Sequence, residues 1–193
     1  MSRLRADDTI EARALEFMTL TAARPEDVIG YRAEKPALDW CEIDLDAKLW
    51  TLPAERAKTG TDHVVPLSGA AVAILEALPH RKGRVFNGAA YHGGLSENAL
   101  LNKAQEVAAA MEGDHVTTAR NLSRKTFRTW ATDNRVEEEG IIELCLAHAV
   151  SEIRSSSTYY KGDAIDRKKH VFDAWAAFAD GQSVGDNVVK LHA

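Results

Sequence analysis

The sequence has few cysteines and no long apolar stretch, so it lacks the material for a disulfide framework, a cysteine metal site or a membrane span. Its 193 residues include two cysteines, Cys41 and Cys145, which lie far apart and form no CxxC spacing. We therefore expect two buried thiols in a reducing cytoplasm. No apolar stretch approaches the ~20 residues that a membrane span needs. The N-terminus, MSRLRADDTIEARA, also lacks the apolar core of a signal peptide, so we expect a cytoplasmic protein with no membrane partner.

The chain also lacks an excess of positive charge. Its net charge is −5 and its sequence pI is near 5.8. This balance argues against a dedicated, strongly basic DNA-binding protein. It does not exclude an enzyme with a local basic cleft, because the local field rather than the total charge steers a phosphate. The 45% hydrophobic and 27% charged composition is typical of one globular domain.

The first part of the chain predicts two helices. Asp8 and Glu11 form a capping-box pattern, so the first helix should begin at Asp8. It should end near Arg24. Pro25 then suits the first turn of a short second helix, PEDVIGYR.

A small antiparallel sheet should follow these helices. Three strand-like runs, LDWCEIDL, KLWTLP and DHVVPL, are separated by turn residues. This arrangement places Lys58 beside the tip of the last hairpin. A short apolar segment, RVF, should be buried farther along the chain.

The remainder of the sequence predicts helices. Ser68 and Ser96 are expected to cap two of them. Further helices are expected over Ser123–Asn134, Glu137–His148 and Ala164–Ala179, with a short helix before Tyr159. The fold class is therefore α+β, a mostly helical domain with a small antiparallel three-stranded sheet.

Five side chains together indicate phosphodiester chemistry: Arg24, Lys58, Arg124, His148 and Tyr159. Arginine binds phosphate through a planar, permanently charged fork, and tyrosine can act as a nucleophile. Each residue alone has an ordinary structural explanation. Arg24 and His148 could stabilise helix ends, and Lys58 could belong to a soluble turn. Arg124 could share a salt-bridged helix face with Arg128.

Four stretches of the sequence resemble the catalytic domain of tyrosine recombinases, in particular the phage and genomic-island integrases. They are LEFMTLTAARPEDVIGYR, WCEIDLDAKLWTLPAERAKTGTDHVVPLS, SRKTFRTWA and LAHAVSEIRSSSTYYKGDAIDRKKHVFDAWAAF. The resemblance extends from about Thr9 to Phe178, and the matching stretches occur in the same order as in the family. Its most specific parts are the ERAKTG turn and the segment YKGDAIDRKK after the tyrosine pair.

The resemblance implies a mechanism. Tyr159 would attack a DNA phosphodiester and form a 3′-phosphotyrosyl link; the adjacent Tyr160 remains an alternative nucleophile. Arg24 and Arg124 would hold the scissile phosphate and stabilise its transition state. Lys58 would protonate the leaving 5′-oxygen.

The resemblance also implies supporting residues, partners and domain limits. His148 would hydrogen-bond a non-bridging oxygen, and Asp27 would support the first arginine. No cofactor or metal is needed, because the covalent link conserves the energy of the broken bond. Expected partners are double-stranded DNA carrying attachment sites, further copies in a tetrameric synapse, and a directionality factor. Residues 1–181 would form the catalytic domain, without the DNA-clamping domain that precedes it in the family, and residues 182–193 a tail that docks in trans.

The family pattern His-x-x-Arg reads Asn121-Leu-Ser-Arg124 in this chain. Asparagine cannot take up a proton near neutral pH. If the missing histidine is a general base, activity should fall by the ~10²–10⁴-fold that such catalysis contributes. His115 is a more distant substitute. Two alternatives therefore stay open: a catalytically impaired recombinase fold that binds DNA or protein, and a type IB topoisomerase.

Overall fold

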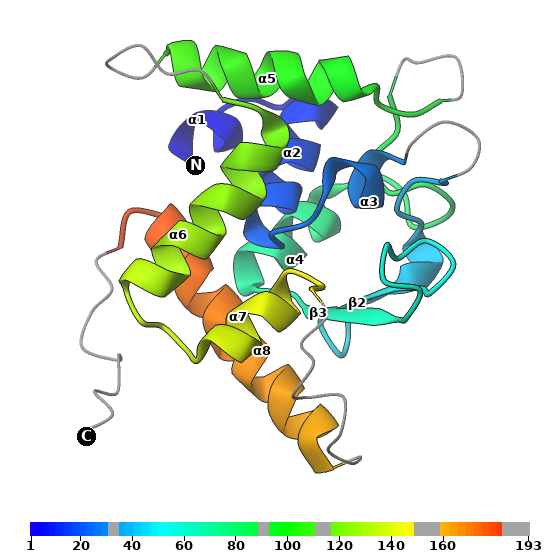
Figure 1. The fold of residues 1–193 in the computed structure, drawn as a ribbon. Coiled ribbons are helices and arrows are strands. Elements are labelled where there is room, and N and C mark those ends of the chain that lie inside the picture. The colour runs from blue at the N-terminus through cyan, green and yellow to red at the C-terminus, as the bar shows by residue number, and fades with distance from the viewer. Residues whose placement is uncertain (31–34, 89–92, 111–116, 149–158, 183–193) are drawn as a thin grey trace.

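The structure is a computed structural model, and it describes residues 1–30, 35–88, 93–110, 117–148 and 159–182 (Figure 1). Helix α2 (Ile10–Leu20) runs through the middle of the molecule, and its residues from Ala14 to Leu20 are all buried. Its neighbours are α1 (Ser2–Arg5), α3 (Pro25–Ile29), α4 (Gly69–Ala77), α5 (Glu97–Ala109), the π-helical turn η2 (Asn121–Lys125) and α8 (Tyr159–Ala179).

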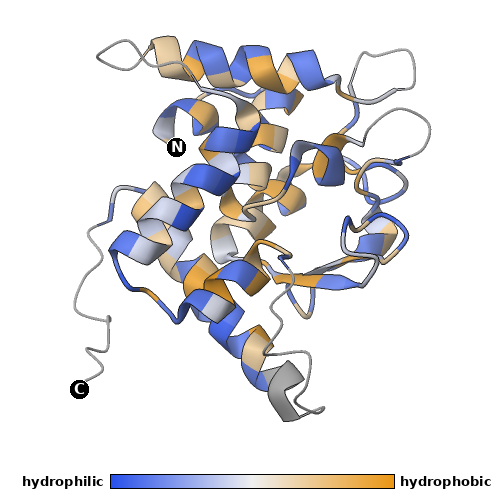
Figure 2. Cartoon of the chain, viewed as in Figure 1, coloured by the Kyte–Doolittle hydropathy of each residue, from blue (hydrophilic) through white to orange (hydrophobic). Residues whose placement is uncertain are grey.

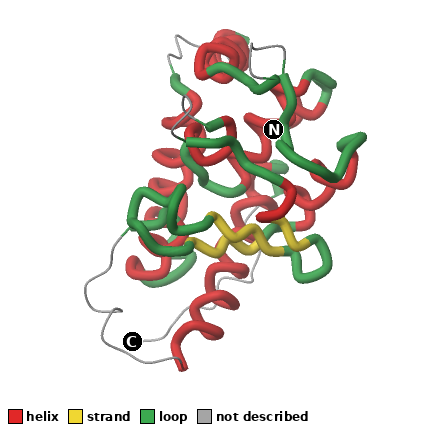
Figure 3. Tube along the Cα trace, turned by 90° about the vertical axis from the view of Figure 1, so that its right-hand side faces the viewer, coloured by secondary structure: helices red, strands yellow, loops and turns green. Residues whose placement is uncertain are grey.

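A three-stranded antiparallel sheet lies at one side of this helical body (Figure 3). Its strands are β1 (Ile43–Asp44), β2 (Leu49–Leu52) and β3 (His63–Pro66), in the order β1-β2-β3. Helix α8 packs against β3. The predicted α+β class is thus confirmed, including the hairpin whose connecting loop holds Lys58.

The hydrophobic core joins α2 to the C-terminal helices, and apolar positions (orange in Figure 2) concentrate between the elements. Phe127 of α6 (Thr126–Asp133) stacks on Phe172 of α8, with ring centroids 5.7 Å apart. Trp130 and Trp175 approach to 5.0 Å. Phe178, the last member of the apolar stripe on α8, is 42% exposed. This packing fixes α6 and α8 relative to α2.

The predicted start of the first long helix is wrong by two residues. The N-cap is Thr9, whose Oγ1 accepts a hydrogen bond from the Ala12 backbone at 3.4 Å. The capping box between Asp8 and Glu11 therefore does not form. Both predicted serine caps are confirmed: Ser68 and Ser96 accept bonds from the amides three residues onward.

The first predicted strand is much shorter than expected. Its beginning forms a 3-10 turn, η1 (Trp40–Glu42), because the Asp39 carboxylate accepts a hydrogen bond from the Cys41 amide at 3.0 Å. Cys41 is exposed on this turn, which corrects the expectation that both thiols are buried. Cys145 is buried, and burial raises the pKa of its thiol to about 12.

The later helices differ from the prediction mainly at their ends. Helix α7 (Glu139–Cys145) is shorter than expected, and α8 begins five residues earlier than expected, at Tyr159. The helix expected over Ser123–Asn134 is present as η2 followed by α6, so it begins before Ser123. The short helix expected before Tyr159, the side chain of His115 and residues 183–193 of the tail lie outside the described residues.

Candidate phosphate-binding site

The candidate site is built on the C-terminal ends of two helices, α2 and α7, which share an unusual backbone conformation. After α2, Ala22 adopts a left-handed conformation with φ 49°, and after α7 Ala147 does so with φ 52°. Each alanine occupies the position where a Schellman motif normally has glycine. The next amides complete the motifs, from Ala23 to Met18 O at 3.1 Å and from His148 to Glu143 O at 3.0 Å.

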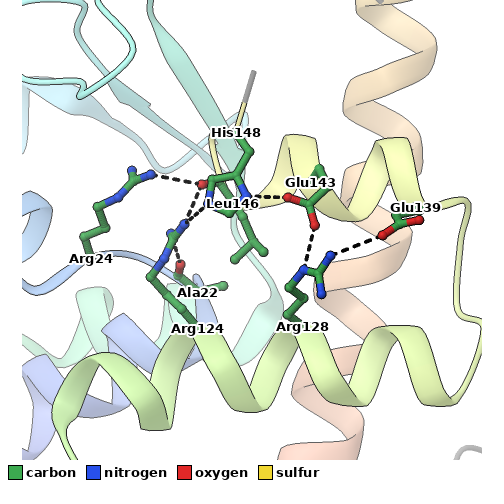
Figure 4. Close-up of polar contacts among 8 residues, drawn as sticks. All are labelled: Ala22, Arg24, Arg124, Arg128, Glu139, Glu143, Leu146 and His148. Atoms are coloured by element: carbon green, nitrogen blue, oxygen red, sulfur yellow. Dashed lines mark hydrogen bonds and ion pairs between the residues drawn. The ribbon is translucent and has the colours of Figure 1, made fainter. Parts of the chain in front are cut away.

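These helix ends hold Arg124. Its Nη1 donates to Ala22 O at 2.9 Å and its Nη2 to Leu146 O at 2.7 Å (Figure 4). Arg24 lies beside it, and its Nη2 is 3.4 Å from the same Leu146 oxygen. The two guanidinium groups, which are 100 residues apart in the sequence, thus share one carbonyl acceptor.

Both arginines are buried, with 4% of Arg24 and 9% of Arg124 exposed. Burial lowers the pKa of Arg124 to about 10, and the charge of Arg24 adds to the effect. The group still stays protonated at neutral pH. Partial negative charge at helix C-termini stabilises such cations.

One carboxylate lies against the pair. Asp27 Oδ2 is 3.6 Å from Arg24 Nη1, as the sequence predicted for Asp27. Burial raises the pKa of Asp27, and the charge of Arg24 opposes this increase. Among the described residues the two arginines make one ion pair, between Arg24 and Asp27, and Arg124 has no carboxylate within ion-pair distance.

A π-helical turn positions Arg124. In η2 the Thr126 amide bonds to Asn121 O, five residues back, and the Thr126 hydroxyl donates to the same oxygen at 3.1 Å. Ser123, which is fully buried, donates to Ala23 O at 3.1 Å. These bonds fix η2 to the end of α2. Such π turns occur frequently at functional sites.

His148 completes the cluster through a chain of polar contacts (Figure 4). Its Nε2 accepts a hydrogen bond from Arg124 Nη2 at 3.0 Å, and its Nδ1 bonds to a carboxylate oxygen of Glu143. The acceptor role of Nε2 assigns the proton to Nδ1. With a side chain 44% exposed, His148 forms the open edge of the site.

Glu143 is held in turn by Arg128, whose Nε donates to it at 2.7 Å. Burial opposes a low pKa for Glu143, but the hydrogen bonds from His148 and Arg128 outweigh it and keep that pKa below its ordinary value. Arg128 also pairs with Glu139 at 3.2 Å. The salt-bridged helix face expected for Arg128 is confirmed. The sequence did not identify Glu143, which lies five residues before the histidine that it orients.

Asn121 and Lys58 lie at the surface, and neither side chain has a hydrogen bond within the described part of the chain. The Asn121 backbone anchors η2, while its side chain is exposed. Lys58 is exposed in the loop between β2 and β3. The structure therefore does not place either side chain against the arginine pair.

Tyr159 is the first residue of α8, and the structure does not describe its side chain or that of Tyr160. Helix α8 meets β3 at Lys168, whose ammonium donates to Val64 O. Nine residues of helix separate Tyr159 from this contact, a length of about 13 Å. Figure 1 shows the first turns of α8 extending beyond the sheet and α7. The described backbone does not bring Tyr159 to the arginine pair.

His63 is a neighbour of the site that sequence reasoning missed. It lines a narrow pocket together with Arg24, Asp27, Arg124 and Ala147. The alternation of side chains along a strand could have identified it, because His63 lies on the same face of β3 as the buried Val65. In the described part of the chain no cluster of metal-ligating side chains is found, and no helix there is long and apolar enough to cross a membrane.

The chain is similar to integrases in sequence and in fold. It is 32% identical over 182 residues to the prophage integrase IntA of Escherichia coli K12, an alignment that covers 91% of this chain and 40% of IntA. It is 28% identical to the prophage integrase IntZ of the same organism, over 90% of this chain and 40% of IntZ. The chain thus spans about 40% of the length of these relatives.

A solved integrase from mycobacterium phage Brujita has a similar fold. The TM-score is 0.57 with 17% sequence identity, and the match covers 88% of this chain and 55% of that one. No protein-family model matches the chain.

Proposed function

The chain belongs with the phage integrases by sequence and by fold, and we propose that it is the catalytic domain of a site-specific DNA recombinase. On this proposal residues 1–181 form that domain. It cleaves and rejoins DNA through a 3′-phosphotyrosyl intermediate and takes part in the integration or excision of a mobile element.

One observation carries the proposal: Arg24 and Arg124 share the carbonyl oxygen of Leu146, and His148 accepts a hydrogen bond from Arg124. Guanidinium groups held by carbonyls rather than by several carboxylates keep their charge available for an anion. The Arg24 Nε is buried and lacks a hydrogen-bond partner within the described residues. A phosphate oxygen would supply one.

The remaining roles follow from the family resemblance. Tyr159 Oη attacks phosphorus, and the bond from phosphorus to the 5′-oxygen breaks. Lys58 gives a proton to that oxygen. Because α8 begins away from the arginine pair, attack requires the Tyr159 segment to approach the pocket when DNA binds. The 5′-hydroxyl of a second strand then displaces the tyrosine.

The test is a covalent adduct on a nicked suicide substrate. Nicked duplexes that span the junctions between the mobile element and its host are incubated with the protein, and adducts are separated on a denaturing gel. We expect an adduct with the unchanged chain and none with Tyr159→Phe. An adduct lost only in Tyr160→Phe would move the nucleophile by one residue.

The phosphate role has its own matched pair of variants. Arg124→Gln should lower the adduct rate by about 10²–10³-fold, the typical effect of removing one transition-state donor. Lys125→Gln removes the same charge from the exposed neighbouring position and should change the rate little. Equal rates in the two variants would contradict the assignment of Arg124.

Asn121 favours a second candidate, a recombinase fold that binds DNA or protein without rapid cleavage. Its exposed side chain supplies no imidazole where the family has one. The substitution Asn121→His discriminates between the two. A large gain in adduct indicates an enzyme with reduced activity, and no adduct in either form, in a chain that carries the DNA-clamping domain, indicates a binding module. Relaxation of supercoiled DNA without site preference would instead indicate a topoisomerase.

Partners follow from the same proposal. The chain would bind double-stranded attachment sites and assemble with further copies into a tetrameric synapse, with a directionality factor selecting excision. The tail from residue 182 would dock on a neighbouring copy.

A further inference from the structure

His63 begins β3, where it pairs with Leu52 across the hairpin that holds Lys58. The same face of the hairpin carries Trp50 and Val65, which are both buried. His63 is half-buried on this face and lines the pocket that also contains Arg24 and Arg124. It therefore connects the Lys58 hairpin to the arginine pair.

The pocket beside His63 is built from charged groups that point to an anion. Arg24, Asp27 and Arg124 line it with His63. Arg24 is buried, and its Nε has no hydrogen-bond partner within the described residues. An unsatisfied guanidinium donor next to a second guanidinium group favours the binding of an oxyanion.

Charged and polar groups from several elements surround the His63 ring. Arg24 at α3, Arg124 in η2, the Cys145 backbone at the end of α7 and Lys168 of α8 act on it, and Asp27 lines the same pocket. Burial first, and then the charges of Lys168, Arg24 and Arg124, lower the pKa of His63 to about 3. The Cys145 backbone, which accepts a hydrogen bond from the ring, acts in the opposite direction. The imidazole is therefore neutral while the pocket holds no anion.

We propose that His63 is a further ligand of the scissile phosphate, which takes up a proton when the anion joins Arg24 and Arg124 and then donates a hydrogen bond to a phosphate oxygen. This inference rests on the proposed function, since it assigns the phosphate to the arginine pair. It also supplies an imidazole to a site in which residue 121 is asparagine.

A bound anion should raise the pKa of His63 by a measurable amount. A unit negative charge about 5 Å away, at an effective dielectric constant near 20, raises a pKa by about two units. Sulfate is a suitable probe because it is tetrahedral and keeps its charge of −2 between pH 4.5 and 8. His63 should therefore stay neutral in chloride and titrate within this range in sulfate.

The experiment follows the ring of His63 in the full chain by NMR from pH 4.5 to 8, in chloride and in sulfate of equal ionic strength. His63→Gln assigns the signal. Guanidinium signals of Arg24 and Arg124 report independently whether sulfate binds. Arg124→Gln should abolish the sulfate-dependent titration, and Lys125→Gln, which removes the same charge at the next position, should retain it.

The outcomes separate this inference from the proposed function. Titration of His63 only in sulfate, and only with Arg124 present, supports it. Sulfate that shifts the guanidinium signals but leaves His63 neutral overturns the role of His63 and leaves the arginine site intact. Sulfate that shifts neither overturns both. If His63→Gln fails to fold, backbone-to-ring correlations in the unchanged chain assign the His63 signal, so the comparison of the two salts still gives a decision.

Discussion

The half-buried position of His63 beside three cationic side chains should make the free protein sensitive to mild acid. Its pKa is about 3 in the folded chain, against an ordinary value of 6.5. The unfolded chain therefore binds an extra proton between these values. Stability is fully present above pH 6.5 and falls as the pH drops below it. Between pH 7 and pH 5 the loss from this one residue is about 2 kcal/mol, at about 1.4 kcal/mol per pH unit below 6.5.

The window from pH 7 to 5 isolates His63 well. Carboxylates whose pKa is lowered, such as Glu137 and Glu143, lose stability only at lower pH, as they approach their unfolded values near 4.5. Asp27 acts in the opposite direction, because its raised pKa favours the folded state on acidification. The contribution of Asp27 is present in both the unchanged chain and His63→Gln, so it largely cancels when their losses of stability are compared.

The assay is urea unfolding followed by circular dichroism at pH 7.0 and 5.0. We expect the unchanged chain to lose about 2 kcal/mol more than His63→Gln does over this interval. His170→Gln, which removes an exposed imidazole from α8, is the matched control and should behave like the unchanged chain. Equal losses in the unchanged chain and in His63→Gln would refute the electrostatic reasoning about the pocket.

Three further predictions concern neighbouring groups. Burial lowers the pKa of Lys168 to about 8, so the charged form is destabilised in the folded chain at pH 7. Lys168→Met should therefore raise the free energy of unfolding at pH 7 by about 1–3 kcal/mol, and this gain should shrink between pH 8 and 10. Chemical unfolding across this pH range measures the gain. Glu143→Gln should slow adduct formation about 10–100-fold by releasing His148, whereas Glu139→Gln should not. Ala147→Gly should raise the free energy of unfolding by about 0.5–1 kcal/mol, because glycine adopts φ 52° without strain; a decrease in calorimetry would contradict this.

The sequence predicted the elements better than their ends. Hydrophobic periodicity placed α2, the hairpin and the aromatic stripe of α8 correctly, since these depend on local patterns. It missed the π-helical turn over Asn121–Lys125, where the Ser123 hydroxyl bonds to Ala23 O, a partner 100 residues away. It also failed at Trp40–Glu42, where the Asp39 side chain competes with strand pairing. Both errors come from hydrogen bonds that no periodic pattern contains.

The candidate site was predictable only in part, for a similar reason. Arg24, Arg124 and His148 were identified from their family setting, and the structure brings them together. Glu143 and His63 were missed because each acts through side-chain contacts in the folded chain: Glu143 with His148 and Arg128, and His63 with the arginine pair at the pocket. Neither residue is distinctive alone, since glutamate is common on helices and a strand histidine is usually structural.

The arginine pair also shows why net charge was a poor guide to this chain. The net charge of −5 is spread over a surface rich in ion pairs, such as Arg128 with Glu139. Such exposed pairs contribute little beyond their immediate surroundings. Arg24 and Arg124 are instead buried against helix C-termini, where carbonyl dipoles stabilise the charge without removing it. Low local dielectric strengthens the field of these two cations toward an approaching phosphate. An acidic chain can therefore present a strongly attractive pocket for an anion, and Arg24→Gln should weaken sulfate binding far more than loss of any exposed lysine.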